Sequence, residues 1–291
     1  MRLAPEGLEV PERIVADQEH VTAAAAVAAV GAAARHVRLA AEAEAAVAAG
    51  AGLDVDASPI LHCHDADMPV MLITGASSGI GAATARAASR AGYSVVLAAR
   101  SVDRLRDLAS ELGDALAVQC DVTEWEQQQA MVSAALERFG RLDVAFANAG
   151  FGAARGFLEE SPEHWRTMVL TNVYGAALTI RACMPALIEA RGHLLLTGSV
   201  AGRRALPGSL YSATKWAVTA MSEAARLELN DTGVRVTLIE PGMVDTPFFA
   251  RGAGPDALKP EDVARAVMFA LEQPAHVDVN EILVRPTAQA N

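Results

Sequence analysis

Short apolar runs alternate with helical stretches from residue 68 to the end of the chain. The first run, residues 69–74, leads directly into a glycine-rich turn, and a helical stretch over residues 82–91 follows. Continuous apolar runs of this length are typical of parallel strands that are buried on both faces. Strands that alternate with helices over such a length predict an α/β fold, a doubly wound parallel sheet of about seven strands with helices on both faces.

The remaining elements follow the same alternation. The strands are expected over residues 69–74, 94–98, 115–119, 142–147, 193–197, 234–240 and 282–284. The helices are expected over residues 82–91, 105–112, 124–139 and about 208–230, with a long helix from Pro162 that breaks near Pro185 and a last helix that opens at Pro260. Thr123 is the expected N-cap of the helix over residues 124–139.

The first 67 residues differ in composition from the rest, which predicts an extension followed by a single domain over residues 68–291. Residues 22–51 are dominated by alanine, which favours a helix around 17–49 but offers little large apolar surface for packing. The extension either packs loosely on the domain or is not part of the native protein. The second interpretation is favoured, because Met68 immediately precedes the first expected strand.

Charge and composition restrict the partners. The formal net charge of −11 disfavours nucleic acid and an anionic membrane surface as partners. The longest alanine-rich apolar run, residues 21–34, is too short to span a bilayer, and the N-terminus carries no secretory pattern. We therefore expect a cytoplasmic protein.

The cysteine and histidine patterns predict neither a disulfide framework nor a metal ion. Cys63, Cys120 and Cys183 are odd in number and far apart, which is typical of reduced thiols in the cytosol. His62 and His64 would point the same way on a strand, but no distant ligand partner is apparent.

The turn after the first expected strand reads Gly75-Ala-Ser-Ser-Gly79-Ile-Gly81. Strand, glycine turn and helix are the context that a dinucleotide-binding loop of a Rossmann-type sheet requires. The glycines let the backbone approach a pyrophosphate, and the helix N-terminus presents free N–H groups to it. Any tight strand-to-helix turn can also use glycine, so the loop alone leaves both interpretations open.

Arg100 follows the second expected strand, where a loop that binds NAD usually has an acid for the ribose 2′-hydroxyl. No acid occurs between Val95 and Ser101. Because a guanidinium suits a 2′-phosphate, Arg100 favours NADP over NAD. The alternative is that Arg100 only lies at a solvent-exposed edge.

Tyr211 and Lys215 are four residues apart in the helix expected over residues 208–230, so they lie on one face. Lys215 is one of only two lysines, the other being Lys259. An ammonium beside a phenol lowers the pKa of the phenol from its ordinary value of about 10. Tyr211 is therefore a candidate proton donor and acceptor, although an exposed helix face could carry the same pair by chance.

Ligands of a doubly wound sheet bind beyond the carboxyl ends of the strands. The features expected at those ends are the Gly75 loop, Arg100, Asp121, Asn148, Ser199 and Pro241. Their common edge is the strongest physical argument for a ligand site there.

Together these motifs resemble those of the short-chain dehydrogenase/reductase family, in its compact one-domain branch, over residues 68–288. The motifs are Thr74-Gly-x3-Gly-Ile-Gly81, Asp121-Val122, Asn148-Ala-Gly150, Asn172, Ser199, Tyr211-x3-Lys215 and Pro241-Gly242. The resemblance implies an NADP-dependent oxidoreductase that transfers hydride between NADP(H) and a carbonyl or secondary alcohol carbon. Residues 279–287 resemble members that act on small hydroxy acids, alcohols or aldehydes.

The resemblance also implies residue roles. Tyr211 is the acid in reduction and the base in oxidation, and Lys215 lowers the pKa of Tyr211 and bonds the nicotinamide ribose. Ser199 donates a hydrogen bond to the substrate carbonyl, and Asn172 holds a water that links Lys215 to solvent. The residues implied in cofactor binding are Gly75, Ser77, Ser78, Gly79, Ile80, Gly81, Arg100, Asp121, Val122, Asn148, Ala149, Gly150, Tyr211, Lys215, Pro241, Gly242, Val244 and Thr246.

Three features depart from the family pattern. Ala147 stands where the turn before Gly150 usually has a second asparagine, and the interval from Ser199 to Tyr211 is one residue shorter than usual. The segment over residues 243–259 is short, which suggests an open site and broad specificity. The candidate wall residues are Phe151, Ala153, Arg155, Val200, Arg203, Leu206 and Phe248. Arg155 or Arg203 could bind a carboxylate or face water.

Two other functions are compatible with this fold. A non-catalytic NADP-binding sensor would be favoured if one of the four implied catalytic residues were missing. Asn172, Ser199, Tyr211 and Lys215 are all present. An epimerase or dehydratase of nucleotide sugars is disfavoured by the glycine spacing and the short C-terminal part. The resemblance further implies a homodimer or homotetramer, formed through the helices near residues 162–184 and 208–230.

Overall fold

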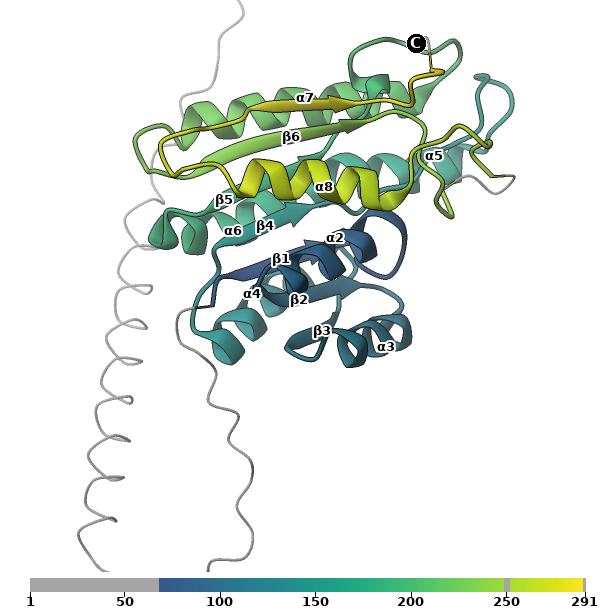
Figure 1. Cartoon of the computed structure of the whole chain (residues 1–291). Helices are drawn as coiled ribbons and strands as arrows, with labels where there is room; N and C mark the ends of the chain where they lie inside the picture. The colour runs from purple at the N-terminus through teal and green to yellow at the C-terminus, as the bar shows by residue number, and fades with distance from the viewer. Residues whose placement is uncertain (1–67, 249–251, 290–291) are drawn as a thin grey trace, which may run out of the picture. The chain divides into compact units, whose positions relative to one another are not determined.

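A parallel sheet of seven strands runs through the part of the chain that the computed structural model describes, residues 68–248 and 252–289 (Figure 1). The strands are β1 (Val70–Thr74), β2 (Ser94–Ala99), β3 (Ala115–Gln119), β4 (Val144–Ala147), β5 (His193–Thr197), β6 (Arg235–Pro241) and β7 (Glu281–Val284). The predicted fold class is confirmed. The expected extension over residues 1–67, with its helix and His62 and His64, lies outside the described residues.

The strand order is β3-β2-β1-β4-β5-β6-β7, so the direction of winding reverses between β1 and β4. At this point β1 pairs with β2 on one side and with β4 on the other, where Ile73 lies opposite Phe146. All five residues of β1 are buried, which explains why its sequence is apolar without alternation. A crevice for ligands is expected at the carboxyl ends of the strands beside this reversal.

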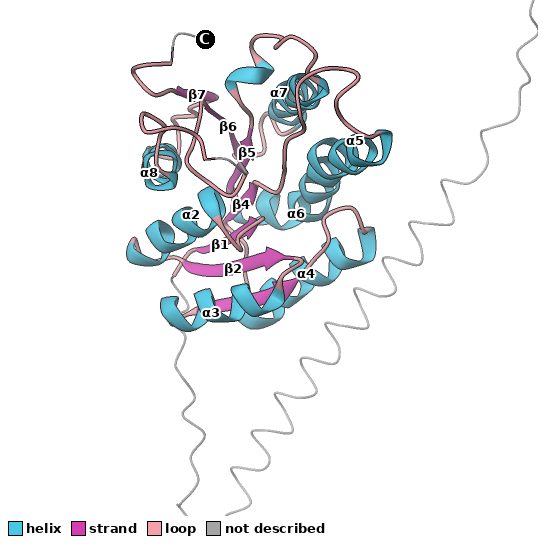
Figure 2. Ribbon diagram, turned by 90° about the vertical axis from the view of Figure 1, so that its right-hand side faces the viewer, coloured by secondary structure: helices cyan, strands magenta, loops and turns pink. Residues whose placement is uncertain are grey.

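Two helical layers cover the sheet (Figure 2). The helices are α2 (Gly79–Arg90), α3 (Val102–Leu112), α4 (Trp125–Phe139), α5 (Pro162–Val169), α6 (Ala176–Ala190), α7 (Leu210–Glu228) and α8 (Pro260–Leu271). Apolar residues of α2, α3 and α8 pack with Met71 and Ile73 of β1, whereas those of α4, α6 and α7 pack with Val70 and Leu72. Because Cβ directions alternate along a strand, successive residues of β1 enter two separate cores.

The helical stretch from Pro162 to Ala190 contains a π turn and is not broken at Pro185. Ser161 caps its start by accepting a hydrogen bond from the backbone N–H of His164 at 3.1 Å. α5 leads into a π turn over Leu170–Gly175, and α6 then continues past Pro185 to Ala190. The predicted break is therefore wrong. Burial of the neighbouring apolar residues of α6 in the core outweighs the one backbone hydrogen bond that a proline removes.

Among the described residues, this stretch is also long and apolar enough to cross a membrane by length and composition alone. Its mean hydropathy reaches 1.2, and 44% of that window is buried inside the protein. A helix that covers one face of a sheet has the same properties, so this is weak evidence for a membrane span.

The capping of α4 also differs from the expectation. The N-cap is Glu124, and the hydroxyl of Thr123 instead donates to Asp121 Oδ1 at 2.8 Å. Asp121 also accepts from the backbone N–H of Thr123, at 3.0 Å. The hydroxyl of Thr123, which was expected to cap α4, thus binds the carboxylate of Asp121 instead.

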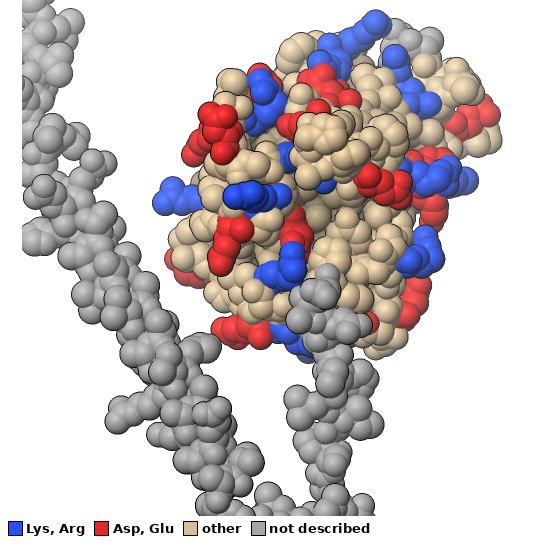
Figure 3. Space-filling view, turned by 60° about the vertical axis from the view of Figure 1, so that its left-hand side comes forward, with Lys and Arg blue, Asp and Glu red and all other residues tan. Residues whose placement is uncertain are grey.

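The charged surface has no dominant sign on the face drawn in Figure 3, where acidic and basic side chains are interspersed. In the interior, Cys120 and Cys183 are free thiols, and burial raises their pKa values to about 11 and about 12. These two cysteines therefore stay protonated near neutral pH.

Candidate functional site

The glycine turn after β1 packs against the residues that follow β4. Gly75 and Gly79 adopt φ values of +67° and +55°, a region that favours glycine. A Cβ added to Gly81 would lie 2.5 Å from the carbonyl oxygen of Gly75 and 2.8 Å from Nδ2 of Asn148. A Cβ at Gly75 would lie 2.9 Å from Cα of Ala149. Side chains are therefore excluded at Gly75 and Gly81, where the turn packs closely against Asn148 and Ala149.

The N-terminus of α2 is arranged to receive an anion. Its N-cap, Ser78, makes no side-chain capping hydrogen bond, and the first turn of α2 contains no acidic residue. The first backbone N–H groups of a helix have no partner within the helix, and the helix dipole is positive at this end. The phosphates of a dinucleotide would supply the missing acceptors and negative charge.

Asn148 connects three neighbouring strand ends. Its side-chain Nδ2 donates to the carbonyl oxygen of Thr74 at 2.9 Å, and its Oδ1 accepts from the hydroxyl of Thr197 at 3.0 Å. The hydroxyl of Thr74 accepts the backbone N–H groups of Asn148 at 3.0 Å and of Ala149 at 3.2 Å. The side chain of Asn148 therefore holds the ends of β1, β4 and β5 in register.

Tyr211 and Lys215 lie one turn apart on α7, as predicted, and Lys215 Nζ lies 5.7 Å from the centre of the Tyr211 ring. Ser209 starts this helix by accepting from the backbone N–H of Ser212 at 3.1 Å. Lys215 is buried, and its Nζ donates to the carbonyl oxygen of Thr197 at 2.7 Å. Burial lowers the pKa of Lys215 to about 8.

The pKa of Tyr211 differs from the expectation. Burial raises it to about 12, and a side-chain hydrogen bond with Ser199 acts in the opposite direction. The sequence predicted a lowered pKa because of the nearby ammonium. Loss of hydration around the phenolate outweighs that attraction, and the ammonium is directed at the carbonyl of Thr197.

Asn172 lies in the π turn and faces both the α7 helix and the segment after β4. Its Oδ1 accepts from the backbone N–H of Phe151 at 3.0 Å, and its Nδ2 donates to the carbonyl of Phe151 at 2.9 Å and to Thr214 Oγ1 at 3.1 Å. A Cβ at Gly150 would lie 3.0 Å from Asn172 Oδ1 and 3.7 Å from Lys215 Nζ. Gly150 thus lets Asn172 and Lys215 come close together.

Ser199 lies at the start of a 3-10 turn, Val200–Gly202, next to the end of β6. Its hydroxyl accepts from the backbone N–H of Ala201 at 3.1 Å and lies 3.5 Å from the carbonyl oxygen of Pro241. Together with the hydrogen bond to Tyr211, these contacts place Ser199 and Tyr211 side by side. The hydroxyl pair forms the part of the site where a carbonyl oxygen could be bound.

Arg203 forms ion pairs with two carboxylates of the protein. Its Nε lies 2.8 Å from both carboxylate oxygens of the buried Glu240, and its Nη2 forms an ion pair with Glu281. Arg203 also lines a pocket of about 450 Å³ beside Val200. Two carboxylates thus compensate its charge, which leaves Arg155 as the better candidate of the two for binding a substrate carboxylate.

The other residues expected in cofactor binding follow the rim of the site. Arg100 is exposed at the end of β2, and its carbonyl oxygen accepts from Gln119 at 3.3 Å. A Cβ at Gly79 would lie 3.1 Å from Thr246, so the segment after β6 reaches the glycine turn. Val244 is buried and pairs with Leu258, so only its backbone could contact a ligand.

Three threonines that were not among the expected site residues hold the site together. Thr74 ends β1 and binds Asn148, and Thr197 ends β5 and binds Lys215. Thr214 Oγ1 donates to the carbonyl of Tyr211 at 2.8 Å. A polar residue that ends an otherwise apolar strand could have indicated the first two. Within residues 68–248 and 252–289, no three potential metal ligands come together.

Comparisons with known proteins agree on one family. The model of the family described as short chain dehydrogenase matches residues 69–253. An uncharacterized oxidoreductase of Staphylococcus haemolyticus is 41% identical over 223 residues, which cover 75% of this chain and 96% of that protein.

Solved structures are similar over the same part of the chain. An alcohol dehydrogenase from the archaeon Thermococcus sibiricus, complexed with 5-hydroxy-NADP, is 38% identical with a TM-score of 0.74, over 77% of this chain and 99% of that one. A 3-ketoacyl-(acyl-carrier-protein) reductase from Brucella melitensis, complexed with NADH, is 30% identical with a TM-score of 0.70, over 75% and 97%.

Proposed function

Since this chain belongs to the short-chain dehydrogenase family, we propose that it is an NADP-dependent oxidoreductase of small carbonyl compounds and alcohols. It interconverts an aldehyde or ketone with the alcohol, or a keto acid with the hydroxy acid. The observation that carries the proposal is the meeting of Ser199, Tyr211 and Lys215 at the carboxyl edge of the sheet. Contacts through Gly150 and Ala149 connect this group to the glycine turn.

Tyr211 moves the proton in the proposed reaction. With its pKa raised to about 12, the phenol is protonated at neutral pH and ready to donate. In reduction, its O–H bond breaks and the proton goes to the substrate oxygen as the substrate carbon gains hydride. Ser199 donates a hydrogen bond to that oxygen while negative charge develops on it.

Lys215 supports the phenolate that remains on Tyr211. A buried ammonium 5.7 Å from the ring centre favours the charged form of the phenol once the proton has left. Both polar ends of the Asn172 side chain are engaged by Phe151 and Thr214. We propose that Asn172 holds a relay water beside Lys215, because its Oδ1 accepts one hydrogen bond and keeps a second lone pair.

The cofactor residues proposed from the sequence fit a nicotinamide dinucleotide. When bound, the nicotinamide supplies or accepts the hydride. The N-terminus of α2, which has no side-chain cap, and the glycine turn beside Thr246 would hold the pyrophosphate of the cofactor. Asp121 would contact the adenine, Asn148 to Gly150 would line the adenosine ribose, and Gly242 to Thr246 would cover the nicotinamide.

Arg100 supports NADP as the preferred cofactor. Its side chain is exposed at the end of β2, at the carboxyl edge of the sheet, where the 2′-phosphate is expected. The similar solved structures include complexes with an NADP derivative and with NADH, so the family itself leaves the choice open. A guanidinium favours the phosphate because it can donate two parallel hydrogen bonds to it.

We propose that the protein is cytoplasmic and forms a homodimer or homotetramer. Large apolar side chains are exposed on the helices of one layer and in the π turn: Leu136, Val169, Leu170, Tyr174, Ile188, Trp216 and Leu227. Exposed apolar patches of this kind mark surfaces where proteins associate. These residues lie on or beside the helices from which the sequence predicted association.

A substrate panel tests the proposal. Purified protein is mixed with NADPH or with NADH and with 2,3-butanedione, 4-nitrobenzaldehyde or a short 3-keto acid, and the loss of reduced-nicotinamide absorbance is followed. We expect turnover with several of these compounds, faster with NADPH at limiting cofactor. Binding of NADPH without consumption by any compound would instead favour a non-catalytic sensor, and one strongly preferred small substrate would contradict broad specificity.

A further inference from the structure

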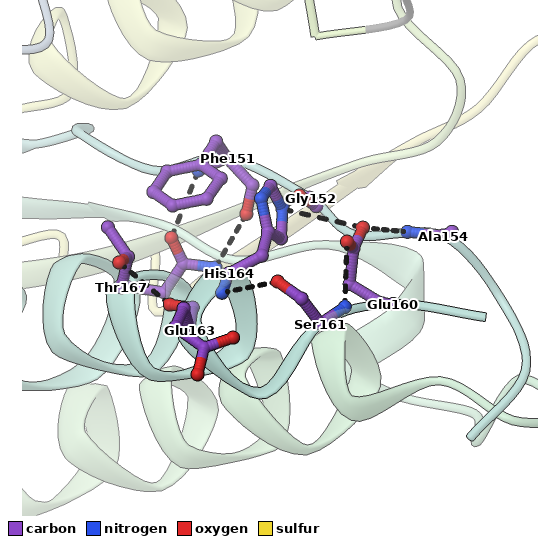
Figure 4. A network of polar contacts seen from close by, with 9 residues as sticks. Phe151, Gly152, Ala154, Glu160, Ser161, Glu163, His164 and Thr167 are labelled. Carbon is purple, nitrogen blue, oxygen red and sulfur yellow. Dashed lines mark hydrogen bonds and ion pairs between the residues drawn. The ribbon is translucent and has the colours of Figure 1, made fainter. Parts of the chain in front are cut away.

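Two side chains of one helical stretch hold consecutive peptide units after Gly150. Asn172 bonds both the N–H and the carbonyl of Phe151, at 3.0 and 2.9 Å. His164 Nε2 lies 2.9 Å from the carbonyl oxygen of Gly152, as Figure 4 shows. A carbonyl oxygen can only accept a hydrogen bond, so Nε2 carries the proton and donates it. The backbone of Phe151 and Gly152 is thus held at two adjacent points.

The π turn brings the two holding residues onto one face of the helix. His164 and Asn172 are eight residues apart, whereas two turns of an α-helix take about 7.2 residues. The π turn over Leu170–Gly175 is wider than an α turn, so eight residues come closer to two full turns. This geometry lets both side chains reach the same backbone segment.

The imidazole of His164 is held between an aromatic ring and a carboxylate. Its ring packs edge-to-face with Phe151, with centres 5.3 Å apart at 79°. Glu160 Oε2 lies 3.8 Å from Nε2, and Glu160 accepts from the backbone N–H groups of Ala154 at 3.2 Å and Ser161 at 3.1 Å. These backbone bonds hold the pKa of Glu160 below its ordinary value. The imidazole therefore has a fixed orientation toward Gly152.

Gly152 in turn sets the position of the aromatic ring beside Tyr211. A Cβ added to Gly152 would lie 2.5 Å from Cζ and 2.9 Å from Cε1 of Phe248. The Phe248 ring packs against the Tyr211 ring, with centres 5.4 Å apart at 65°. A displacement of the Gly152 backbone would therefore move the ring that lies against the proton donor.

From these contacts we infer that His164 is a positioning residue that fixes the Phe151–Gly152 backbone as one wall of the substrate crevice. Through Gly152 and Phe248, it sets the space in front of Tyr211 and hence the affinity for the carbonyl compound. The inference rests on the proposed function, because this crevice receives substrate only if Tyr211 is the proton donor. His164 is not itself among the residues proposed to bind the cofactor, so its loss is expected to affect substrate affinity rather than cofactor affinity.

Three variants test this role. His164→Ala removes the donor to Gly152, and His164→Gln replaces it with an amide N–H of similar reach. His276→Ala removes an exposed histidine in the loop between α8 and β7 and is the matched control. Each protein is assayed for kcat and KM with NADPH and 2,3-butanedione or 4-nitrobenzaldehyde, for its NADPH Kd, and for hydrogen exchange of the peptide over residues 150–158.

We expect His164→Ala to raise KM for the carbonyl compound roughly 2- to 10-fold, the size of one hydrogen bond, and to speed exchange in residues 150–158. kcat and the NADPH Kd should stay near the wild-type values, His164→Gln should recover most of the loss, and His276→Ala should behave as wild type. Unchanged KM and exchange in His164→Ala, or a matching loss in NADPH affinity, would overturn the inference.

The exchange measurement separates this inference from the proposed function. If the wild-type protein consumes NADPH with none of the compounds, the proposed function fails. Faster exchange in His164→Ala, reversed in His164→Gln, would still support a wall held by His164. Equal exchange in all four proteins would refute that role on its own, with or without turnover.

Discussion

At Tyr211, burial and charge act in opposite directions. Burial raises the pKa of the phenol to about 12, while the hydrogen bond with Ser199 favours the phenolate. The ammonium of Lys215, 5.7 Å from the ring centre, is the nearby positive charge. The proposed proton donor is therefore protonated at neutral pH, and Ser199 is already in place to stabilise the phenolate that it would leave. This arrangement suits reduction of a carbonyl, in which the donor must first hold the proton.

Replacement of Tyr211 by phenylalanine tests the proton donor directly. General acid catalysis by a placed side chain contributes about 10² to 10⁴ in rate, so we expect Tyr211→Phe to lower kcat by at least about a hundredfold. NADPH binding, measured by fluorescence titration, should be retained. Tyr93→Phe, in the α2–β2 connection, is the control. Activity that survives in Tyr211→Phe would mean that another acid donates the proton.

Arg100 is the proposed determinant of the preference for NADP. A hydrogen bond to a charged group contributes about 1.5 to 3 kcal/mol, so Arg100→Asp should weaken NADPH binding roughly ten- to a hundredfold. NADH binding should change much less, because NADH lacks the 2′-phosphate. Arg90→Asp, at the last residue of α2, is a control with the same charge change. Equal losses for both cofactors would contradict the assignment.

At the scale of elements, the central strands carry both the core and the site. β5 begins with a buried histidine and ends with Thr197, which binds Asn148 and Lys215. His193 Nε2 lies 2.7 Å from Thr237 Oγ1 of β6, while its Nδ1 has no hydrogen-bond partner in the described part of the chain. Burial lowers the pKa of His193 to about 3, so this strand carries a neutral imidazole in the folded state.

The buried imidazole makes stability depend on pH. The folded pKa of about 3 lies below the ordinary 6.5, so the unfolded chain binds a proton first as the pH falls below 6.5. Acidification therefore lowers the free energy of unfolding. His193 alone accounts for a loss of about 1.4 kcal/mol between about pH 7.5 and about pH 5.5. Urea unfolding of wild type and His193→Gln at both pH values measures it. The variant should lack this part of the loss, and parallel losses in both proteins would contradict the assignment.

At the scale of the whole molecule, the sheet brings together residues from most of the chain. The switch between β1 and β4 places the glycine turn next to Asn148, and β5 and β6 add Thr197, Ser199 and Pro241 along the same edge. α7 runs alongside β6 (Figure 1). Its first turns carry Tyr211 and Lys215, and Lys215 Nζ donates to the carbonyl oxygen of Thr197 at the end of β5. Helices α4, α6 and α7 of the same layer also carry exposed apolar residues, among them Leu136, Ile188 and Trp216.

A charged residue in this apolar group should impair association. Trp216 is 47% exposed on α7, one residue after Lys215. We expect Trp216→Asp to shift the sedimentation coefficient of the protein from a dimer or tetramer to a smaller species, because burying an unpaired carboxylate at an interface is unfavourable. Leu158→Asp is the control, since Leu158 is 97% exposed outside this group. A wild-type protein that sediments as a monomer would contradict the proposed assembly.

The sequence by itself determined the fold class, the positions of the strands and the pairing of Tyr211 with Lys215. These follow from hydrophobic periodicity, glycine turns and the helical repeat, which are all local. Only the tertiary structure decided the pKa of Tyr211, the partners of Arg203, the continuation of the helix past Pro185 and the hold of His164 on Gly152. Each of these depends on burial, on loop geometry or on contacts between segments that are distant in sequence. No local sequence pattern encodes the hydration that a side chain loses on folding.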